Sequence, residues 1–379
     1  MSTRRLPARA AIAVLMGALV GCSSVTGVEF DVPVTPPPGE APVFAATEVV
    51  PVEGIPAGNG TLSAVATGPG GVVAVGRLGL HLPVSPPIVV LSQDGRSWER
   101  VGPEQGFDLV DVAASADAFV AVGSRVPPEG QAVRSAFLVS PDGRTWEALD
   151  GAAYGGAEAY VAQVAAGPGG FRATGNLVSD GRRVSWTSAD GRSWTVDADP
   201  IWLAAAAPEV WVEARGAEVR ITRDGAEPGP WTRLEEPRGD ETILHFDAIV
   251  IGRAGMLVVG AVGTGCGPFG SCASRQRGWW SEDGVEWRIL PIGDPGWSGE
   301  RVNALSATAD GTIVTAANFG PLATHDGWRW TALLPQGVLG GTVYDMAAIN
   351  DGLVLVGDAP WPAAATAPWA AIVVLAGGG

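Results

Sequence analysis

The sequence predicts an all-β protein assembled from repeated units of four short antiparallel strands. Three observations lead to this prediction. The pattern Ser/Thr-x-Asp-Gly-x-x-Trp, called the Asp-Gly turn below, recurs along the chain of 379 residues. Between its copies, short β-branched or apolar runs alternate with turn signals, as in an antiparallel meander. The last unit stops before its fourth strand, while an early apolar run, 44–50, belongs to no unit.

The Asp-Gly turns are predicted to be structural. A carboxylate two residues after Ser or Thr and directly before Gly can organise a tight turn, and the glycine supplies positive φ cheaply. The tryptophan would bury much of its ring against neighbouring strands. One carboxylate per turn is too thin a ligand set for calcium, so no metal is expected. The six copies contain Asp94 and Trp98, Asp142 and Trp146, Asp190 and Trp194, Asp224 and Trp231, Asp283 and Trp287, and Asp326 and Trp330.

Each unit repeats the same order of elements. The first unit begins with run 62–66, which is followed in order by a Gly-Pro-Gly-Gly turn, run 72–76, a variable loop, run 88–91, an Asp-Gly turn and run 98–101. The fourth unit is short and rich in Ala, and its Asp-Gly turn has three extra residues, so we expect it to be irregular. The predicted units are 62–101, 109–149, 161–196, 201–234, 246–290, 302–334 and 343–375 plus 44–50.

Ring closure accounts for both ends of the repeat. Run 44–50 would supply the missing outer strand of the last unit, and closure would protect the sheet edges. Seven units over 44–375 average about 47 residues each, which is in the range of β-propeller blades. The predicted fold is therefore a seven-bladed β-propeller of four-stranded antiparallel blades, closed by an N-terminal strand in the last blade.

The repeat resembles the Asp-box, or BNR repeat, of sialidase-like β-propellers, over nearly all the mature chain. In that family the Asp-box lies between the third and fourth strands, and ligands bind at the opposite face. The resemblance also implies an arginine triad, an Arg-Ile-Pro-type motif and a Tyr nucleophile with a Glu partner. The chain has only three Tyr, its one Arg-Leu-Pro lies at 5–7, and run 62–66 contains no Arg. We therefore expect a non-catalytic member of the family, with no catalytic residues.

Two sets of polar residues could form a binding site at the loop-rich face. The first set lies near the starts of the inner strands: Ser63, Asp111, Gln163, Asp247, Asn303 and Asp345. These would either form a polar ring for a cation or hydroxyl-rich ligand, or hydrogen-bond neighbouring blades and hold channel water. The second set is Arg in variable loops, with Arg77, Arg125 and Arg134 as candidates. Arg with exposed Trp suits carboxylate or sugar recognition; the alternative is that Arg solvates the loops.

The function predicted from these residues is recognition of a glycan, peptide or protein. A glycoside hydrolase or lyase of sialidase-like fold is the alternative, because Asp111, Asp247 and Asp345 could pair across the channel. No cofactor or metal is expected, since the three His do not cluster and no phosphate-loop, dinucleotide or nucleophile-elbow motif is present.

The N-terminal residues predict export and lipid attachment. Three Arg precede an apolar run, 10–20, that is too short to span a bilayer. The run ends in Leu-Val-Gly-Cys, which resembles a bacterial lipoprotein lipobox and implies a signal peptide, 1–21, with acylation of Cys22. An ordinary signal peptide with a chance Cys is the alternative. Residues 22–43 would form a Pro-rich tether, and 44–379 the propeller.

Composition bears on partners and compartment. Loss of the signal peptide takes the formal charge from −16 to −19, and an acidic surface repels nucleic acid. All basic residues are Arg, which is typical of a GC-rich genome. Cys266 and Cys272 flank a short segment that can turn back, so a disulfide is expected in an oxidising envelope. We expect a monomer, held by its lipid at the outer face of the cytoplasmic membrane.

Overall fold

The described part of the chain is built from strands. The computed structural model describes residues 44–50, 60–78, 86–103, 106–125, 134–151, 158–236, 241–264, 273–290, 302–308, 311–317, 320–324, 330–333, 342–350, 352–358 and 370–377. All of them lie in Thr35–Gly379, the second of two units into which the chain divides. Among these residues there is no helix with the length and apolar character that a membrane crossing requires.

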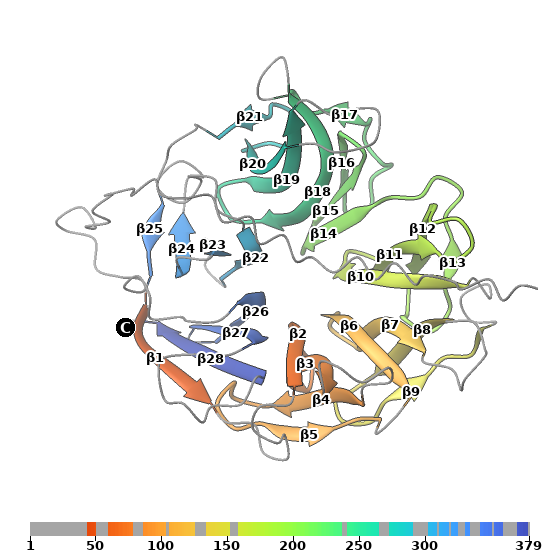
Figure 1. Cartoon of the computed structure of the whole chain (residues 1–379), viewed down its shortest axis with the longest axis vertical. Helices are drawn as coiled ribbons and strands as arrows, with labels where there is room; N and C mark the ends of the chain where they lie inside the picture. The colour runs from red at the N-terminus through yellow and green to blue at the C-terminus, as the bar shows by residue number, and fades with distance from the viewer. Residues whose placement is uncertain are drawn as a thin grey trace, which may run out of the picture. The chain divides into compact units, whose positions relative to one another are not determined.

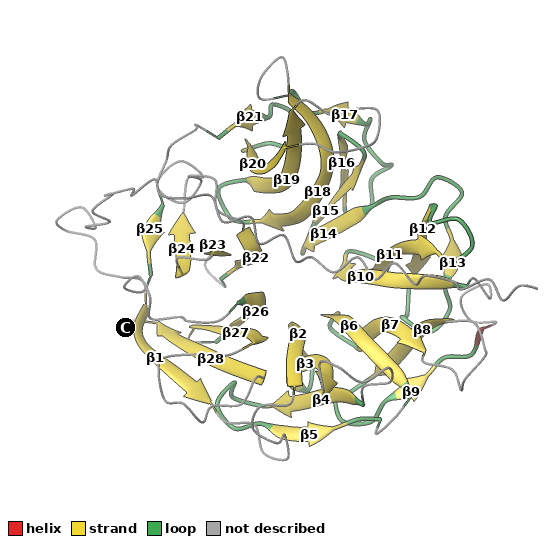
Figure 2. Ribbon diagram, in the orientation of Figure 1, coloured by secondary structure: helices red, strands yellow, loops and turns green. Residues whose placement is uncertain are grey.

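The strands form four-stranded antiparallel sheets, as predicted, in which sequence neighbours pair (Figures 1 and 2). One sheet contains β2 (Gly60–Gly68), β3 (Gly71–Leu78), β4 (Pro87–Ser92) and β5 (Glu99–Val101). Another contains β6 (Phe107–Ala114), β7 (Phe119–Arg125), β8 (Arg134–Ser140) and β9 (Glu147–Ala148). Next come β10 (Ala159–Gly167), β11 (Gly170–Leu177), β12 (Arg183–Ser188) and β13 (Thr195–Val196). These are followed by β14 (Leu203–Ala207), β15 (Val210–Arg215), β16 (Glu218–Arg223) and β17 (Thr232–Arg233).

The C-terminal half repeats this organisation. One sheet contains β18 (Glu241–Ile251), β19 (Met256–Thr264), β20 (Ala273–Ser281) and β21 (Arg288–Ile289). The next contains β22 (Val302–Ala307), β23 (Ile313–Ala317), β24 (Gly320–Thr324) and β25 (Thr331–Ala332). The last contains β26 (Val343–Ile349), β27 (Gly352–Asp358) and β28 (Ala370–Gly377), with β1 (Phe44–Val50) at its edge. β1 pairs antiparallel with β28, with Val50 opposite Ile372.

Apolar side chains between neighbouring sheets form most of the core. Sheets β2–β5 and β6–β9, for example, share a cluster that includes Val73, Leu109 and Phe119. The space between sheets β10–β13 and β14–β17 is different, because its buried apolar cluster consists of only Ile201, Ala204 and Trp211. Charged and hydroxyl side chains occupy much of this interface instead.

A β-bulge recurs in the first strand of the sheets and explains a glycine in the second strand. A Cβ added at Gly76 would lie 1.9 Å from the carbonyl oxygen of Thr61, and one at Gly123 would lie 2.0 Å from that of Asp108. The bulge therefore brings the backbone of the first strand close to the second strand and leaves no room for a Cβ at Gly76 or Gly123. In the bulged pairing of β22 with β23, Ala317 stands at the corresponding position. Sheet β14–β17 has no bulge in the pairing of its first two strands, and Ala214 stands opposite Leu203.

The fifth sheet begins earlier than predicted. β18 starts at Glu241 rather than near 246, and its pairing with β19 contains two register shifts instead of one. The additional shift lies between Ile243 and His245. A strand with two bulges loses its simple alternation of side chains, which hides its start from pattern analysis.

Candidate functional site

The polar residues near the starts of the first strands occupy two different positions relative to the β-bulge. The extra residue of the bulge is Ser63, Asp247 or Asn303 in three of the strands. The residue after the bulge is Asp111, Gln163 or Asp345 in three others. A bulge inserts one unpaired residue into a strand. Members of the first group are that unpaired residue, and members of the second group are the paired residue that follows it. The two groups therefore have different surroundings.

The residues after the bulge connect neighbouring sheets. Asp345 Oδ2 accepts a hydrogen bond from the backbone N–H of Val65 at 2.8 Å, and Asp111 Oδ2 accepts one from Val164 at 2.7 Å. Gln163 Oε1 accepts a hydrogen bond at 3.2 Å from the backbone N–H of Ala204, on the first strand of the next sheet. These contacts favour the interpretation of the ring as a set of links between sheets.

Burial changes the protonation of the two carboxyl groups. It raises the pKa of Asp345 to about 7, against the lowering effect of its backbone hydrogen bonds. Burial also raises the pKa of Asp111 well above its ordinary value, and the nearby charge of Asp345 raises it further. Two acids that disfavour each other's ionisation, each with an amide donor, are held in place by the backbone.

Asp247 also makes contact toward the next sheet, through a second side chain. Its Oδ2 accepts a hydrogen bond from Gln276 Nε2 at 2.8 Å, and Gln276 Nε2 also donates to the carbonyl of Val302 at 3.2 Å. His245 Nε2 lies 3.0 Å from Asp247 Oδ1. Ser63 and Asn303 are partly buried. Asp247 is therefore linked to the next sheet through Gln276, whereas Asp111 and Asp345 accept backbone N–H groups of the next sheet directly.

Arg125 and Arg134 are exposed cations on either side of a variable loop. They stand directly opposite each other in the pairing of β7 with β8. Like charges at such positions destabilise a sheet, and neither Arg has an ion-pair partner within the described ranges. The guanidinium of Arg125 lies over the ring of Phe107, 5.6 Å from its centroid. Arg77 differs, since it lies 3.7 Å from Asp108.

Four other Arg residues that lie beside variable loops are held by neighbours. Arg182 forms an ion pair with Asp180, and Arg183 lies 5.2 Å from the ring centroid of Trp202. Burial lowers the pKa of Arg183. Arg275 and Arg277 lie on β20, beside the fully buried Glu241. Four residues singled out in the sequence lie outside the described residues: Cys22, Cys266, Cys272 and Asp326.

The carboxylates of most described Asp-Gly turns serve the turn itself. Asp94 Oδ1 accepts hydrogen bonds from the N–H groups of Arg96 and Ser97, both at 2.8 Å, and these amides lower its pKa. Trp98 Nε1 donates to the carbonyl of Gly95 at 2.8 Å. The same pair of amide contacts is made by Asp142, Asp190 and Asp283. These carboxylates are used within their own turns.

The fourth Asp-Gly turn is built differently. Within the described residues, the Asp224 carboxylate accepts no hydrogen bond; its backbone N–H donates to the carbonyl of Glu209 at 2.8 Å. Trp231 contacts the guanidinium groups of both Arg215 and Arg220, whose central carbons are 4.1 and 4.4 Å from its ring centroid. The stretched sequence has therefore lost the turn contacts made by the other copies.

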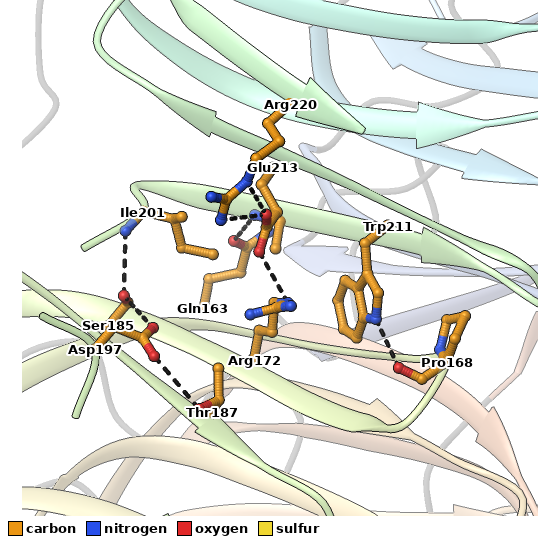
Figure 3. A network of polar contacts seen from close by, with 11 residues as sticks. Gln163, Pro168, Arg172, Ser185, Thr187, Asp197, Ile201, Trp211, Glu213 and Arg220 are labelled. Atoms are coloured by element: carbon orange, nitrogen blue, oxygen red, sulfur yellow. Dashed lines mark hydrogen bonds and ion pairs between the residues drawn. The ribbon is translucent and has the colours of Figure 1, made fainter. Parts of the chain in front are cut away.

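A polar network between sheets β10–β13 and β14–β17 was not predicted (Figure 3). Glu213 is fully buried, and its Oε2 accepts a hydrogen bond from Arg220 Nε at 2.7 Å. Arg172 Nε reaches from the other sheet to 2.9 Å from Glu213 Oε1. The signal in the sequence was the acid itself, which interrupts the buried run of β15.

Comparison with known proteins supports the fold. No protein-family model matches the sequence, and no curated protein matches it. The chain is similar in structure to the β-propeller domain of the Trilobed protease from Pyrococcus furiosus, with a TM-score of 0.52 and 11% identity over 83% of this chain and 95% of that one.

Two further structures are similar at a level too low to support inference. The GH93 α-L-arabinofuranosidase of Fusarium graminearum has a TM-score of 0.48 and 12% identity, over 86% of this chain and 97% of that chain. The β-propeller domain of Cps50 (Swd1) from Myceliophteria thermophila has a TM-score of 0.49 and 8% identity, over 87% and 99%. The four-stranded sheets and the similarity to the Pyrococcus domain define the chain as a β-propeller protein.

Proposed function

We propose that this protein is a lipid-anchored, seven-bladed β-propeller that binds a glycan, peptide or protein at its loop-rich face. The observation that carries the proposal is the pair Arg125 and Arg134. Two exposed cations opposite each other cost stability, and they lie where β7 and β8 enter a variable loop of a strongly acidic chain. An acidic group on a ligand would supply the counter-charge that the described residues do not provide, and Arg is well suited to hold it.

The proposed blade count and ring closure rest on three supports. The described strands form seven four-stranded sheets. The first strand of each sheet contacts the first strand of the next, including β26 with β2. β1 and β28 pair, although they lie near opposite ends of the sequence. We also propose that the Asp-Gly turns belong to the Asp-box type, because four of their carboxylates accept the same two backbone amides.

Binding is favoured over hydrolysis by the inner-strand carboxylates. A glycosidase needs two carboxyl groups free to exchange protons with a substrate. Here Asp111 and Asp345 each accept an amide hydrogen bond from the neighbouring sheet. Losing those bonds during a reaction would weaken the contacts between sheets. We therefore propose that these carboxylates are structural.

The lipid anchor, its placement at the outer face of the cytoplasmic membrane and the disulfide rest on the sequence. Cys22→Ala should move the protein from the membrane fraction to the soluble fraction and abolish incorporation of labelled palmitate. Retention of label in that variant would refute lipidation at Cys22.

Mass analysis of the non-reduced full chain, after thiol alkylation, would detect the bond between Cys266 and Cys272. We further propose a monomer that binds no nucleic acid.

The test of binding uses the full chain on a glycan array and in pull-downs from envelope extracts. The variant Arg125→Gln/Arg134→Gln should lose at least ten-fold in affinity for the ligand found. Arg288→Gln, which removes an exposed charge from a different sheet, is the matched control and should bind as the wild type does. Equal binding by all three proteins would refute the assignment to this face. Cleavage of an array glycan would instead establish the hydrolase alternative.

A further inference from the structure

A cavity of about 340 Å³ opens between sheets β10–β13 and β14–β17. This volume lies within the range of small-molecule sites. Its lining comes from the Gly-Pro-Gly-Gly turn between β10 and β11, from the Asp-Gly turn after β12, and from Arg172 and Trp211. It therefore lies at the Asp-Gly-turn ends of the strands, away from the variable loops after the second strands.

The cavity exists because the fourth Asp-Gly turn does not dock where the other turns dock. A Cβ at Gly143 would lie 2.7 Å from Val73 of the preceding sheet, whereas a Cβ at Gly225 would meet no described residue beyond its chain neighbours within 4 Å. The two Gly-Pro-Gly-Gly turns show the same contrast. A Cβ at Gly70 would lie 2.0 Å from the carbonyl of Asp142, while the equivalent Gly169 faces open space. The three extra residues of the fourth turn thus leave a slot uncovered.

The slot carries an unbalanced positive charge. Glu213 Oε2 is held by Arg220, through Nε at 2.7 Å and a terminal nitrogen at 2.6 Å. Arg172 is the second cation on this one carboxylate, and its Nε makes no hydrogen bond despite lying 2.9 Å from Oε1. Among the described lining residues Arg172 is the only charged one. A buried cluster of two cations and one anion favours a further anion.

Arg172 is held in an orientation suited to a planar anion (Figure 3). Its guanidinium lies 5.0 Å from the ring centroid of Trp211. That indole is fixed by a hydrogen bond from Nε1 to the carbonyl of Pro168 at 2.8 Å. Within the described ranges no hydrogen bond engages the terminal nitrogens of Arg172, and the side chain is 21% exposed. A guanidinium placed over an aromatic ring can still present its fork of N–H donors to a carboxylate.

The remaining lining is rich in hydroxyl groups. Thr187 and Thr195 stand opposite each other in the pairing of β12 with β13, and Ser193 lies in the adjoining turn. Asp197 accepts hydrogen bonds from Ser185 at 2.6 Å and Thr187 at 3.3 Å and does not line the slot. Asp190, in the adjoining turn, does not line the slot either, and its Oδ1 accepts hydrogen bonds from the N–H groups of Arg192 and Ser193. Hydroxyl groups around one cation match a ligand that carries several hydroxyls and one carboxylate.

We propose that this slot binds an acidic monosaccharide unit, with its carboxylate on Arg172 and its hydroxyls toward Thr187, Ser193 and Thr195. The site is separate from the loop-rich face. It needs no movement of the sheets, because Arg172, Trp211 and Glu213 already support one another. The neutral sugar of the same shape should bind weakly, since the charge-assisted contact supplies most of the preference.

The test titrates the full chain with glucuronate, glucose and inorganic sulfate by calorimetry. Glucuronate should bind at least ten-fold more tightly than glucose or sulfate, and Arg172→Gln should remove this preference. Equal affinity for glucuronate and glucose would overturn the proposal. So would equal affinity for glucuronate and sulfate, because a simple anion lacks the hydroxyl groups that Thr187, Ser193 and Thr195 would bind.

A second pair of variants tests the slot without disturbing the ion pairs. Ala189 lines the slot and is exposed at a turn position that Gln93 and Glu282 occupy in other sheets, so the turn accepts longer side chains. Ala189→Glu should weaken glucuronate binding at least five-fold more than Ala189→Gln, because only the former adds a repelling charge. The variant Arg125→Gln/Arg134→Gln should bind glucuronate normally. Loss of binding in that variant, with retention in Ala189→Glu, would place the sugar at the loop-rich face and refute the slot.

Discussion

The carboxylate of Asp345 and the backbone N–H of Val65 form a hydrogen bond of 2.8 Å across 280 residues of sequence. The bond joins the last described sheet to the first. Asp111 on β6 makes the same kind of contact to the backbone N–H of Val164 on β10, which belongs to the next sheet. In both cases a partly buried carboxyl group, whose pKa is raised by burial, satisfies a backbone amide near the middle of the molecule. Stability should therefore depend on the protonation of these groups.

Asp345 should make the protein less stable as pH rises from about 4 to about 7. Its pKa is about 7 in the folded chain, against an ordinary value of 3.8. In this window the folded state binds the proton that the unfolded state has lost, so the free energy of unfolding falls with pH, by up to roughly 1.4 kcal/mol per unit. Urea unfolding at pH 5, 6, 7 and 8 measures the slope.

Asp345→Asn is the control for this prediction. The amide oxygen of Asn can still accept the hydrogen bond from Val65, but the side chain does not titrate. The variant should therefore keep the link and show a smaller slope. Asp111 supplies the residual slope, and the loss of the neighbouring charge should lower the Asp111 pKa. A slope unchanged by the substitution would show that Asp345 does not titrate in this window.

Gly123→Ala should destabilise the protein by about 1–3 kcal/mol, which is typical of overpacking. The added Cβ would meet the carbonyl oxygen of Asp108 at 2.0 Å, and a backbone atom cannot move aside cheaply. Ala214→Gly is the matched control, because Ala214 occupies the corresponding position opposite a strand without a bulge. Thermal unfolding of both variants measures the difference. A Gly123→Ala variant as stable as the wild type would refute the steric role of the glycine.

The repeated sheets were predictable because their signals are local. Glycine turns and β-branched runs mark each strand, so the sheets follow from the sequence alone. The bulges were not predicted, although Gly76 and Gly123 carried their signal, because a bulge is set by pairing between strands. For the same reason the sequence did not reveal that Ser63 and Asp111 occupy different positions relative to their bulges. The slot at Arg172 could not be predicted, since it results from a turn in another sheet that fails to dock.

Asp190→Ala and Asp224→Ala should differ in their effect on stability. Asp190 Oδ1 accepts two backbone amides, at 2.8 and 2.9 Å, whereas the Asp224 carboxylate accepts none in the described part of the chain. Removing the former should cost about 1 kcal/mol, as loss of a capping side chain does, and removing the latter close to nothing. Chemical denaturation of the two variants tests this. Equal losses would mean that the fourth turn is organised like the others.

Arg134→Glu should stabilise the protein and weaken binding at the loop-rich face. The substitution replaces a like-charged pair, Arg125 with Arg134, by an opposite pair at the same cross-strand position. Such a pair contributes roughly 0.2–1 kcal/mol. The melting temperature should rise slightly while the ligand identified on the array binds less tightly. A lower melting temperature would show that an unrecognised partner already balances the two cations.

Glu213→Gln should be the most destabilising of these substitutions. Glu213 is fully buried and its single carboxylate pairs with both Arg172 and Arg220, so its loss leaves two cations without this partner at an interface with little apolar packing. Removing one partner of a buried ion pair costs about 3–5 kcal/mol. Glu218→Gln is the matched control, because its pair with Arg215 is partly exposed and should contribute at most about 1 kcal/mol. If the folded Glu213→Gln protein is recovered, glucuronate should stabilise it more than it stabilises the wild type, since the added carboxylate replaces the lost one. Equal losses in the two variants would show that Glu213 does not hold the two sheets together.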